Sequence, residues 1–422
     1  MKNLFLFSAL AIVLITCSSP REEPVTPPNS GIHFTVEDDF KPMSLTSEED
    51  GYALYYADEN SWHRISSSDL IHWQESMQID IPGNSIGEIV KDENNTSGLG
   101  DASTPALIAI YARSKDIEMR FSRNNGTSWE SGNIRIPPNV FGNPKVTRDL
   151  QSDQWIMSVA DANTTTFLTS KNLTDWKYET DITLQAKVTT ASLCRLDQTW
   201  TLLLSGGAIM SIKLDQNFQM IEPFRTMQIN PGHPAVHPLT ADKLVFLTNI
   251  GNRLLSLPSQ LSLAQNSQLR IEKYESLANL AVTKKRSKLS SLRGQDASRF
   301  QFKIEDIDKE AELTLFNEQG EMVRIVLSDK LIQVDKTQAS RAQPGELVSH
   351  PWNSQANSAE IDLLIDHGVI ALTIGESTNL SFEVKPVFIY DRVSLKIGGK
   401  ETDARSILYT LKKDNPSAAT SI

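Results

Sequence analysis

A serine, a short polar turn and a tryptophan recur three times in the first half of the chain. The phrase occupies residues 68–73 (SDLIHW), 122–129 (SRNNGTSW) and 170–176 (SKNLTDW), with the tryptophans about 50 residues apart. A repeat of this length has the size of a four-stranded propeller blade, which needs its neighbours to bury its apolar faces. Propeller blades surround a central funnel in which such proteins bind ligands. Because the tryptophans recur once per repeat, we expect them to pack within the blades.

Short apolar runs bounded by turns continue this pattern from residue 32 to about residue 280. Examples are 52–56 (YALYY), 106–111 (ALIAIY) and 200–204 (WTLLL), and no long amphipathic helix interrupts them. Further strand-like runs at short spacing, such as 300–304 and 361–365, follow after residue 295 and fit a β-sandwich. The sequence therefore predicts an all-β chain.

The domain boundaries follow from changes in composition. The 422 residues suit two domains. We place a propeller at 32–280, a sandwich at 295–410 and a tail at 411–422. The basic, polar stretch at 281–294 (with KKRSK at 284–288) is predicted to be a solvated linker. The net charge of −11 and the absence of a longer basic run argue against nucleic acid as a partner.

The N-terminus has the pattern of a targeting signal. Residues 1–16 combine Lys2 with an apolar run too short to span a bilayer. The run ends in LIT before Cys17, which resembles the box where bacterial lipoproteins are acylated, although Thr16 replaces the usual small residue. Residues 17–31 are polar and proline-rich and predict a flexible tether. We expect a lipid-anchored protein of the bacterial cell envelope whose only membrane contact is its lipid; the alternative is a plain secretory signal.

The chain has one other cysteine, Cys194, within an apolar run. If Cys17 is acylated, no disulfide can form within the chain. Cys194 is therefore predicted to be a buried, unreactive thiol.

Four segments, in a consistent order, carry a resemblance to a known family. They are 62–73, 92–100 (DENNTSGLG), 257–263 (LPSQLSL) and 359–366 (AEIDLLID). In that order they resemble the Trp-Gly-His…Ser-Lys-Asp-Leu-Val-His-Trp, Asn-Thr-Ser-Gly-Phe-Gly, Ser-Leu-Pro-Arg-Glu-Leu and sandwich segments of glycoside hydrolase family 32, the levanase, inulinase and invertase family. The resemblance covers residues 32 to 395. It implies a five-bladed β-propeller followed by a C-terminal β-sandwich, with no cofactor and with a carbohydrate ligand.

Family 32 enzymes are retaining β-fructosidases, which need a nucleophilic carboxylate, an acid/base carboxyl group and a third, stabilising carboxylate. The family's Asn-Asp-Pro-Asn-Gly motif corresponds to residues 40–44, which puts Lys41 at the nucleophile position. Its Arg-Asp-Pro motif corresponds to 142–144, with Asn143 at the stabilising position, and its Glu-Cys-Pro-Asp motif puts Thr189 at the acid/base position. All three carboxylates are thus replaced.

These replacements alter the chemistry. An ammonium group at Lys41 would repel the oxocarbenium-like transition state that a carboxylate stabilises. Asn143 lacks the charge of aspartate, and Thr189 cannot deliver a proton at neutral pH. The family's sugar-binding positions also differ, because Ala57, Ile86 and, late in the propeller, Pro234 replace its polar residues.

Other carboxylates could replace the lost ones. Asp39 reaches the nucleophile position if the alignment shifts by two residues, and Glu88 and Asp101 are weaker candidates. The alternative for Asp39 is an exposed acidic turn, and Glu88 is expected to be at the surface unless it contacts a sugar hydroxyl.

Four residues are candidates for substrate binding: Trp62, His63, Glu88 and Asn143. An aromatic ring at Trp62 could stack on a sugar, with packing inside a blade as the equally weighted alternative. His233 and His237 have the spacing of a helical metal site, but the prolines around them exclude a helix, so we expect loop residues and no metal.

Three hypotheses remain open at this point. The first is a family 32-like surface lipoprotein that binds fructan or a related glycan and has lost hydrolysis. The second is an active, β-fructosidase-like glycosidase that uses substitute carboxylates. The third is a non-enzymatic surface lipoprotein that binds another protein.

Overall fold

The computed structural model describes most of the chain after residue 30. The described ranges are 31–36, 39–101, 104–185, 187–196, 199–205, 210–221, 225–226, 232–263, 269–295, 297–352, 357–366, 368–376 and 378–412. The predicted signal sequence and all but the last residue of the predicted tether, with Cys17, lie outside these ranges. No helix among the described residues is long and apolar enough to cross a membrane.

Five four-stranded antiparallel sheets form the first part of the molecule. The first three contain β1 (Lys41–Glu48), β2 (Gly51–Ala57), β3 (Ser61–Ser67) and β4 (Gln74–Pro82); β5 (Gly87–Asp92), β6 (Ala106–Arg113), β7 (Asp116–Ser122) and β8 (Glu130–Gly132); and β9 (Asn143–Asp149), β10 (Gln154–Asp161), β11 (Thr164–Ser170) and β12 (Lys177–Thr183).

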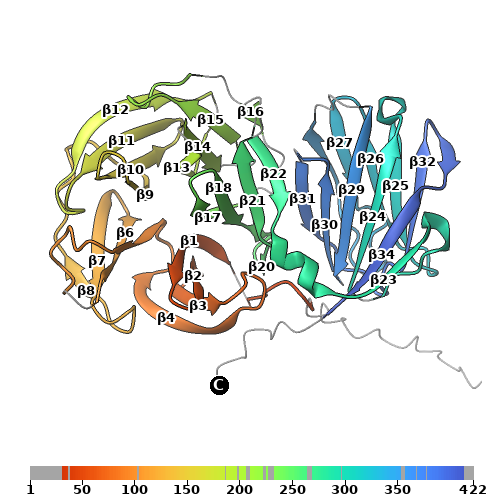
Figure 1. Cartoon of the computed structure of the whole chain (residues 1–422), viewed down its shortest axis with the longest axis horizontal. Coiled ribbons are helices and arrows are strands. Elements are labelled where there is room, and N and C mark those ends of the chain that lie inside the picture. Colours follow the sequence, from red (N-terminus) through yellow and green to blue (C-terminus); the bar gives the residue numbers. More distant parts are fainter. Residues whose placement is uncertain are drawn as a thin grey trace, which may run out of the picture.

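The fourth and fifth sheets complete the set. They contain β13 (Thr190–Leu196), β14 (Thr199–Ser205), β15 (Met210–Leu214) and β16 (Arg225–Thr226); and β17 (Ala235–Thr240), β18 (Lys243–Leu247), β21 (Ser259–Leu263) and β22 (Leu269–Lys273). A small hairpin, β19 (Asn249–Ile250) with β20 (Leu254–Leu255), interrupts the last sheet. Figure 1 shows the sheets arranged in a ring with their first strands towards the centre, and contacts link β17 to β1, β1 to β5, β5 to β9 and β9 to β13.

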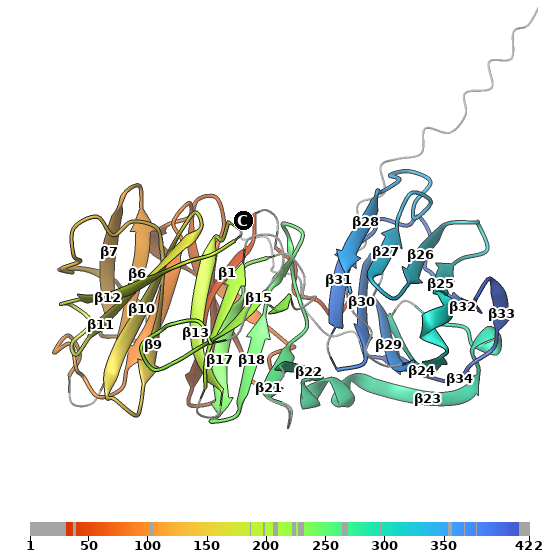
Figure 2. The ribbon, with the colours of Figure 1, turned by 90° about the horizontal axis from the view of Figure 1, so that it is seen from above.

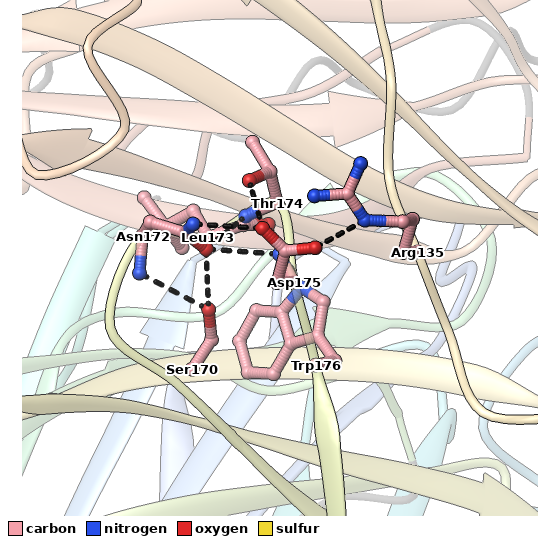
Figure 3. Close-up of polar contacts among 7 residues, drawn as sticks. All are labelled: Arg135, Ser170, Asn172, Leu173, Thr174, Asp175 and Trp176. Carbon is pink, nitrogen blue, oxygen red and sulfur yellow. Dashed lines mark hydrogen bonds and ion pairs between the residues drawn. The ribbon is translucent and has the colours of Figure 1, made fainter.

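The recurring Ser–turn–Trp phrase closes a hairpin in three of these sheets. In the third copy, the Asn172 side-chain oxygen accepts hydrogen bonds from the backbone N–H groups of Thr174 and Asp175, at 3.1 and 2.9 Å (Figure 3). The Trp176 ring N–H donates to the Leu173 carbonyl at 2.8 Å, and the indole is buried. The tryptophan thus caps the turn from inside, and the prediction that it packs within its sheet is confirmed.

The same turn recurs in the first and second sheets. Asp69 accepts from the N–H groups of Ile71 and His72 at 2.9 and 2.8 Å, and the Trp129 ring donates to the Gly126 carbonyl at 3.0 Å. The sequence repeat is therefore a repeated hydrogen-bonded turn, in which the side-chain oxygen of Asp or Asn takes the place of a backbone acceptor.

Two six-stranded sheets form the second part. One has the order β23-β34-β24-β29-β30-β31 and the other β28-β27-β26-β25-β32-β33. Their bounds are β23 (Ala281–Lys288), β24 (Ala297–Glu305), β25 (Ala311–Phe316), β26 (Met322–Leu327), β27 (Leu331–Asp335), β28 (Leu347–Pro351), β29 (Ser358–Asp366), β30 (Val369–Ile374), β31 (Thr378–Glu383), β32 (Arg392–Ile397), β33 (Lys400–Thr402) and β34 (Arg405–Leu411). One continuous core, which includes Phe300, Leu313, Ile325 and Leu363, fills the space between these sheets.

The all-β prediction is confirmed, since helical structure in the described ranges is limited to three short 3₁₀ helices. These are η1 (Glu275–Leu280), η2 (Leu289–Ser291) and η3 (Ile307–Lys309). The predicted linker needs correction: residues 281–288 are strand β23, which pairs with β34 along its length. Its basic side chains are mostly exposed because β23 is an edge strand, and backbone pairing on one side does not require buried side chains.

A buried carboxylate joins the two parts, which lie side by side in Figure 2. Asp366, at the end of β29, accepts hydrogen bonds from the backbone N–H groups of Gly31, Ile32 and His33 at 3.0, 2.9 and 3.3 Å. The His33 ring adds a contact of 2.9 Å, and both side chains are fully buried. The chain is thus fixed to the sandwich sheet where it enters the ring.

Candidate functional site

The starts of the first strands bring the sequence-predicted catalytic positions together. Lys41 begins β1 and Asn143 begins β9, while Thr189 directly precedes β13. Because each of these strands lies next to the centre of the ring, their starts form one rim around it. The segment before β17 brings His233 to the same region.

Asn143 and Thr189 are in direct contact. The Asn143 side-chain amide donates a hydrogen bond to the Thr189 backbone carbonyl at 2.8 Å. An aspartate at this position could not make that bond, because an ionised carboxylate is only an acceptor. Two of the three positions inferred from the family motifs therefore meet in space, through a contact that requires the amide.

Lys41, at the nucleophile position, forms an ion pair with Asp39. Both side chains are partly exposed, at 26% and 31%, so a ligand can reach them. Lys41 lies opposite Ala57 on the neighbouring strand, where the family has a glutamine. Lys41, at the nucleophile position, and Asp39, one of the substitute carboxylates, thus neutralise each other's charge.

Glu88 lies deeper and pairs with a lysine that is not among the predicted site residues. Its carboxylate is 3.0 Å from the Lys145 ammonium group, and the two side chains are only 14% and 3% exposed. Lys145 also donates a hydrogen bond to the Met43 carbonyl, and Ser44 hydrogen-bonds to Glu88. Burial raises the pKa of the Glu88 carboxyl group, while the Lys145 ammonium opposes that shift.

The expectation that Glu88 lies at the surface is therefore corrected. Its pair with Lys145 ties β1, β5 and β9 together at the centre of the ring. The sequence did offer a signal for Lys145, because this ionisable residue directly follows Pro144 of the segment matched to the Arg-Asp-Pro motif. Nothing local, however, pointed to Glu88 as its partner.

His233 belongs to the same electrostatic neighbourhood. Burial lowers its pKa to about 4, and the nearby charges of Lys145 and Lys41 add to this shift while Asp39 opposes it. The imidazole is therefore neutral at physiological pH. His237, in contrast, lies within strand β17 rather than in a loop, and its ring contacts the Leu45 carbonyl at 3.2 Å. In the described part of the chain no group of three or more His, Cys, Asp or Glu residues could hold a metal ion.

Trp62 is not available to a sugar. The side chain is fully buried in a core between the first two sheets, and its ring N–H donates to the Ser85 hydroxyl at 3.1 Å. The structure corrects its assignment as a binding residue in favour of the packing alternative. His63 stacks on Tyr56, with ring centroids 5.0 Å apart, and contacts Asp58 at 2.7 Å; its role in binding stays a prediction.

Asp101 lies on a different segment from Glu88. It lies in the loop after β5, whereas Glu88 lies at the beginning of that strand. Six residues of extended chain separate the two ends by on the order of 15–20 Å. Asp101 accepts the Thr104 N–H at 2.8 Å, and its role as a substitute for a catalytic carboxylate stays a prediction.

One exposed aromatic residue, next to the site in sequence, was not among the predicted residues. Phe141 is 46% exposed and directly precedes Gly142 and Asn143. Gly142 has a φ of +123°, and a Cβ atom there would lie 2.2 Å from the Ala160 carbonyl oxygen, so a side chain in place of the family's arginine would not fit this backbone. Because position 142 is a glycine, Phe141 is the nearest large side chain before Asn143 in the sequence.

The thiol of Cys194 lies away from this chemistry. It is buried in β13, 3.3 Å from the Thr201 carbonyl, and burial raises its pKa to about 12. A thiol with that pKa is almost entirely protonated at neutral pH, which agrees with the prediction of an unreactive group.

The ring of sheets with a polar centre, followed by a two-sheet sandwich, defines a fold found in solved fructosidases. The exo-inulinase of Aspergillus awamori superposes with a TM-score of 0.75 at 15% identity, over 92% of this chain and 99% of the inulinase. A β-fructofuranosidase of Schwanniomyces occidentalis, complexed with fructosyl-erythritol, gives 0.70 at 15% identity, over 91% and 98%. No protein-family profile matches the chain.

Sequence comparison points to the same group. A levanase of Bacillus sp. (strain L7) is 30% identical over 162 residues, which are 32% of this chain and 18% of the levanase. The first three curated levanases are matched over only 18% to 40% of their own lengths. The resemblance predicted from the sequence is confirmed to this extent: about a third of the chain is similar to levanases in sequence, and the chain shares the fold of the solved fructosidases.

Proposed function

We propose that this protein is a non-hydrolytic, glycan-binding member of the family 32-like proteins. In this proposal the five four-stranded sheets are the blades of a five-bladed propeller, and the rim formed by Lys41, Asn143 and Thr189 is its ligand funnel. Fructan or a related neutral glycan is the ligand. The observation that carries the proposal is that none of these three converging positions holds a carboxylate.

The hydrogen bond from Asn143 to Thr189 supports this proposal. It stabilises the rim through an amide donor, at 2.8 Å, where a fructosidase needs a charged acceptor. The site is therefore built around the replacement, and an aspartate would set two acceptors against each other.

The two carboxylates near the centre also support a loss of hydrolysis. Asp39 is paired with Lys41, and Glu88 is paired with the buried Lys145. Cleavage with retention needs negative charge beside a developing oxocarbenium ion. Two ammonium groups offset that charge, and the repulsion between a cation and the transition state grows as water is excluded. Hydroxyl groups of a bound sugar, in contrast, can bond to both members of the partly exposed Lys41–Asp39 pair.

A single panel of glycans tests binding and cleavage separately. Inulin, levan and sucrose, with unrelated neutral glycans as controls, are assayed by calorimetry and by release of reducing sugar. We expect saturable binding of at least one fructan and no release above a boiled-protein control. Release of fructose at an enzyme-like rate would falsify the proposed loss of hydrolysis, and absence of binding across the panel would remove its ligand class.

One observation favours an active glycosidase as the second candidate. Burial raises the pKa of Glu88, as a general acid requires, and Asp39 lies next to the nucleophile position. If these two groups catalyse cleavage, Asp39→Asn and Glu88→Gln each abolish sugar release while the wild type retains it. If the wild type releases none, this candidate is excluded.

We further propose that the protein is anchored to the bacterial cell envelope by a lipid on Cys17. The support is the sequence alone: a charged start, a short apolar run and a cysteine followed by a polar, proline-rich segment. One lipid-bearing residue with a flexible tether would hold the folded part away from the membrane surface.

A further inference from the structure

Strand β23, at one edge of the sandwich, carries a cluster of basic side chains that lies apart from the centre of the ring. The strand supplies Lys284, Lys285, Arg286 and Lys288, and Arg405 lies opposite Lys288 on the neighbouring β34. All five side chains are exposed, and neither strand contains an acidic residue. Because the whole chain has a net charge of −11, positive charge is concentrated at one edge of an acidic protein.

The register of β23 puts three of these cations in one row. Lys284, Arg286 and Lys288 alternate along the strand, so they share one face of the sheet. Lys285 points to the opposite face, since it lies opposite Leu408, a residue of the sandwich core. The row therefore faces away from that core, and Figure 2 shows β23 along the lower border of the sandwich.

Neighbouring carboxylates do not neutralise this row. No carboxylate among the described residues forms an ion pair with a cation of β23, whereas Lys303, two strands away, pairs with Glu305 at 2.7 Å. Asp403 lies near Lys288, but its carboxylate accepts hydrogen bonds from the N–H and hydroxyl groups of Ser290 at 3.1 and 2.7 Å. The charge of the row is thus free to meet an anionic partner.

Protection of a sheet edge explains the cluster only in part. Charged side chains on an edge strand do prevent pairing with another chain. The other edge strands of the sandwich are β28, β31 and β33, and their charged residues are only Lys400, Glu383 and Glu401. Since those edges need no comparable cluster, its concentration on β23 indicates a binding partner.

The start of β23 lies close to the point at which the chain enters the folded part. The Gly31 N–H donates to Asp366 at the end of β29, and Asp366 lies opposite Ala297 at the start of β24. Ala281 begins β23 at the same end of this sheet and packs against a cluster that contains Ile32. Three strand spacings separate β29 from β23, which is about 15 Å.

This position points to one partner. Residues 17–30 span at most about 45–50 Å, longer than the roughly 26 Å of β23, so a lipid on Cys17 allows the whole strand to reach the membrane. We propose that β23 is a membrane-docking edge, whose cations contact anionic lipid headgroups of the membrane that holds the tether. The inference rests on the proposed lipid anchor only in the choice of a membrane as the partner.

Docking adds a second membrane contact to the lipid that the sequence predicts as the only one. A tether alone leaves the folded part free to stand away from the membrane, whereas the cations attract anionic headgroups. Salt screens this attraction within about 8 Å at physiological ionic strength, so β23 would not hold an unanchored protein of net charge −11. The tether keeps the strand at a high effective concentration near the headgroups, and the docked protein has one orientation.

The test measures whether β23 lies on lipid in the anchored full chain. A fluorophore on Val282→Cys reports on β23, and the same fluorophore on Leu347→Cys, in β28 at the opposite border in Figure 2, is the reference. The two native side chains are 64% and 55% exposed. Labelling is specific because Cys194 is buried, with its pKa raised to about 12. A headgroup quencher in phosphatidylcholine vesicles, with or without phosphatidylglycerol, detects docking.

Two triple variants separate the strand from the net charge. One removes the row on β23, and the other removes three exposed lysines from turns and loops of the ring. The substitutions are Lys284→Gln, Arg286→Gln and Lys288→Gln in the first, and Lys115→Gln, Lys171→Gln and Lys187→Gln in the second. We expect quenching at position 282 only with phosphatidylglycerol. The ratio of docked to undocked molecules falls by at least about tenfold in the first variant, and it keeps its wild-type value in the second.

The remaining outcomes overturn the inference or its premise. Equal quenching at positions 282 and 347, or an equal loss in both triple variants, shows that β23 does not dock and leaves the lipid anchor standing. A protein that does not float with neutral vesicles refutes the anchor. Docking then stands only if anionic vesicles at low salt bind the wild type at least about tenfold more tightly than the first variant, and otherwise falls too. Release of β23 from the vesicles by an equal charge of soluble dextran sulfate shows that a polyanionic glycan, rather than lipid, is the partner.

Discussion

The buried pair of Glu88 and Lys145 gives the sharpest quantitative prediction. In Glu88→Gln the Lys145 ammonium, 3% exposed, keeps its bond to the Met43 carbonyl but loses its counter-charge. Breaking a buried ion pair by removing one partner costs about 3–5 kcal/mol, and the retained carbonyl bond places the expected loss near the lower value. For a unit of 150–250 residues, about 3 kcal/mol lowers the melting temperature by about 6–12 °C.

The reciprocal variant, Lys145→Met, has a different pH dependence. Burial already raises the pKa of Glu88, and removing the opposing ammonium raises it further. A carboxyl group whose pKa is higher in the folded protein than in the unfolded chain stabilises the fold at low pH, where it is protonated in both states. That contribution is lost as the pH rises from the unfolded pKa, about 4.3, through the raised folded pKa. The cost of Lys145→Met therefore grows with pH.

Urea unfolding followed by tryptophan fluorescence provides the measurement, because six of the seven tryptophans precede residue 201 and report on the ring. The matched control is Glu130→Gln, which breaks the exposed pair of Arg123 and Glu130, with side chains 46% and 58% exposed, and should change stability by less than about 1 kcal/mol. A loss in Glu88→Gln no larger than in this control, or a pH-independent cost of Lys145→Met, would refute the buried pair as a link between the strands.

Three further outcomes are expected. Asn143→Asp loses the donor to the Thr189 carbonyl and costs about 1–3 kcal/mol in urea unfolding, without producing sugar release; unchanged stability would show that the contact contributes nothing. Phe141→Ala weakens fructan binding in calorimetry, whereas Tyr178→Ala, an equally exposed aromatic on the outer strand β12, leaves it unchanged; equal effects would remove Phe141 from the funnel. Cys17→Ser abolishes lipid labelling and membrane fractionation, and a variant that still sediments with membranes would disprove the anchor.

The fold could be predicted to the extent that its signals are local. The serine, the turn residue and the tryptophan of each repeat lie within eight residues, so the hydrogen-bonded turn can be predicted from local sequence alone. The strands of β6 and β14 were equally visible as apolar runs. The strand at 281–288 could not be predicted, because its side chains are exposed and basic while its backbone pairs with β34, more than one hundred residues away. The residue types of a segment indicate whether its side chains are buried or exposed, but they do not show which strand its backbone pairs with.

In the site, too, the positions set by local motifs could be predicted, and the contacts between separate sheets could not. Short motifs predict the positions of Lys41, Asn143 and Thr189. The hydrogen bond between Asn143 and Thr189 is what two neighbouring site positions would show. The partner of Glu88 could not be predicted, because Lys145 lies on a different sheet and only the closure of the ring brings it near. Trp62 shows the converse error, since a motif position suggested a ligand contact while the packing of two sheets buries the ring.

The replacements at the centre of the ring are compensated, and this determines what reversing them can achieve. Lys41→Asp would set a new carboxylate beside Asp39, which now balances the lysine, and Asn143→Asp would face the Thr189 carbonyl. Thr189→Glu would add a third negative charge to this rim, beside Asn143. The family's enzymes hold three such groups, whereas this variant would also keep Asp39 and Glu88. Because these additional like charges disfavour ionisation, we expect the restored groups not to reach the protonation states that catalysis with retention requires. We therefore expect the triple variant to fold less stably than the wild type and to release no fructose from levan, with Ala57 and Ile86 still in place of the family's sugar-binding residues. Recovery of hydrolysis in that variant, measured as released reducing sugar, would mean that the site is a decayed fructosidase rather than one rebuilt around its new residues.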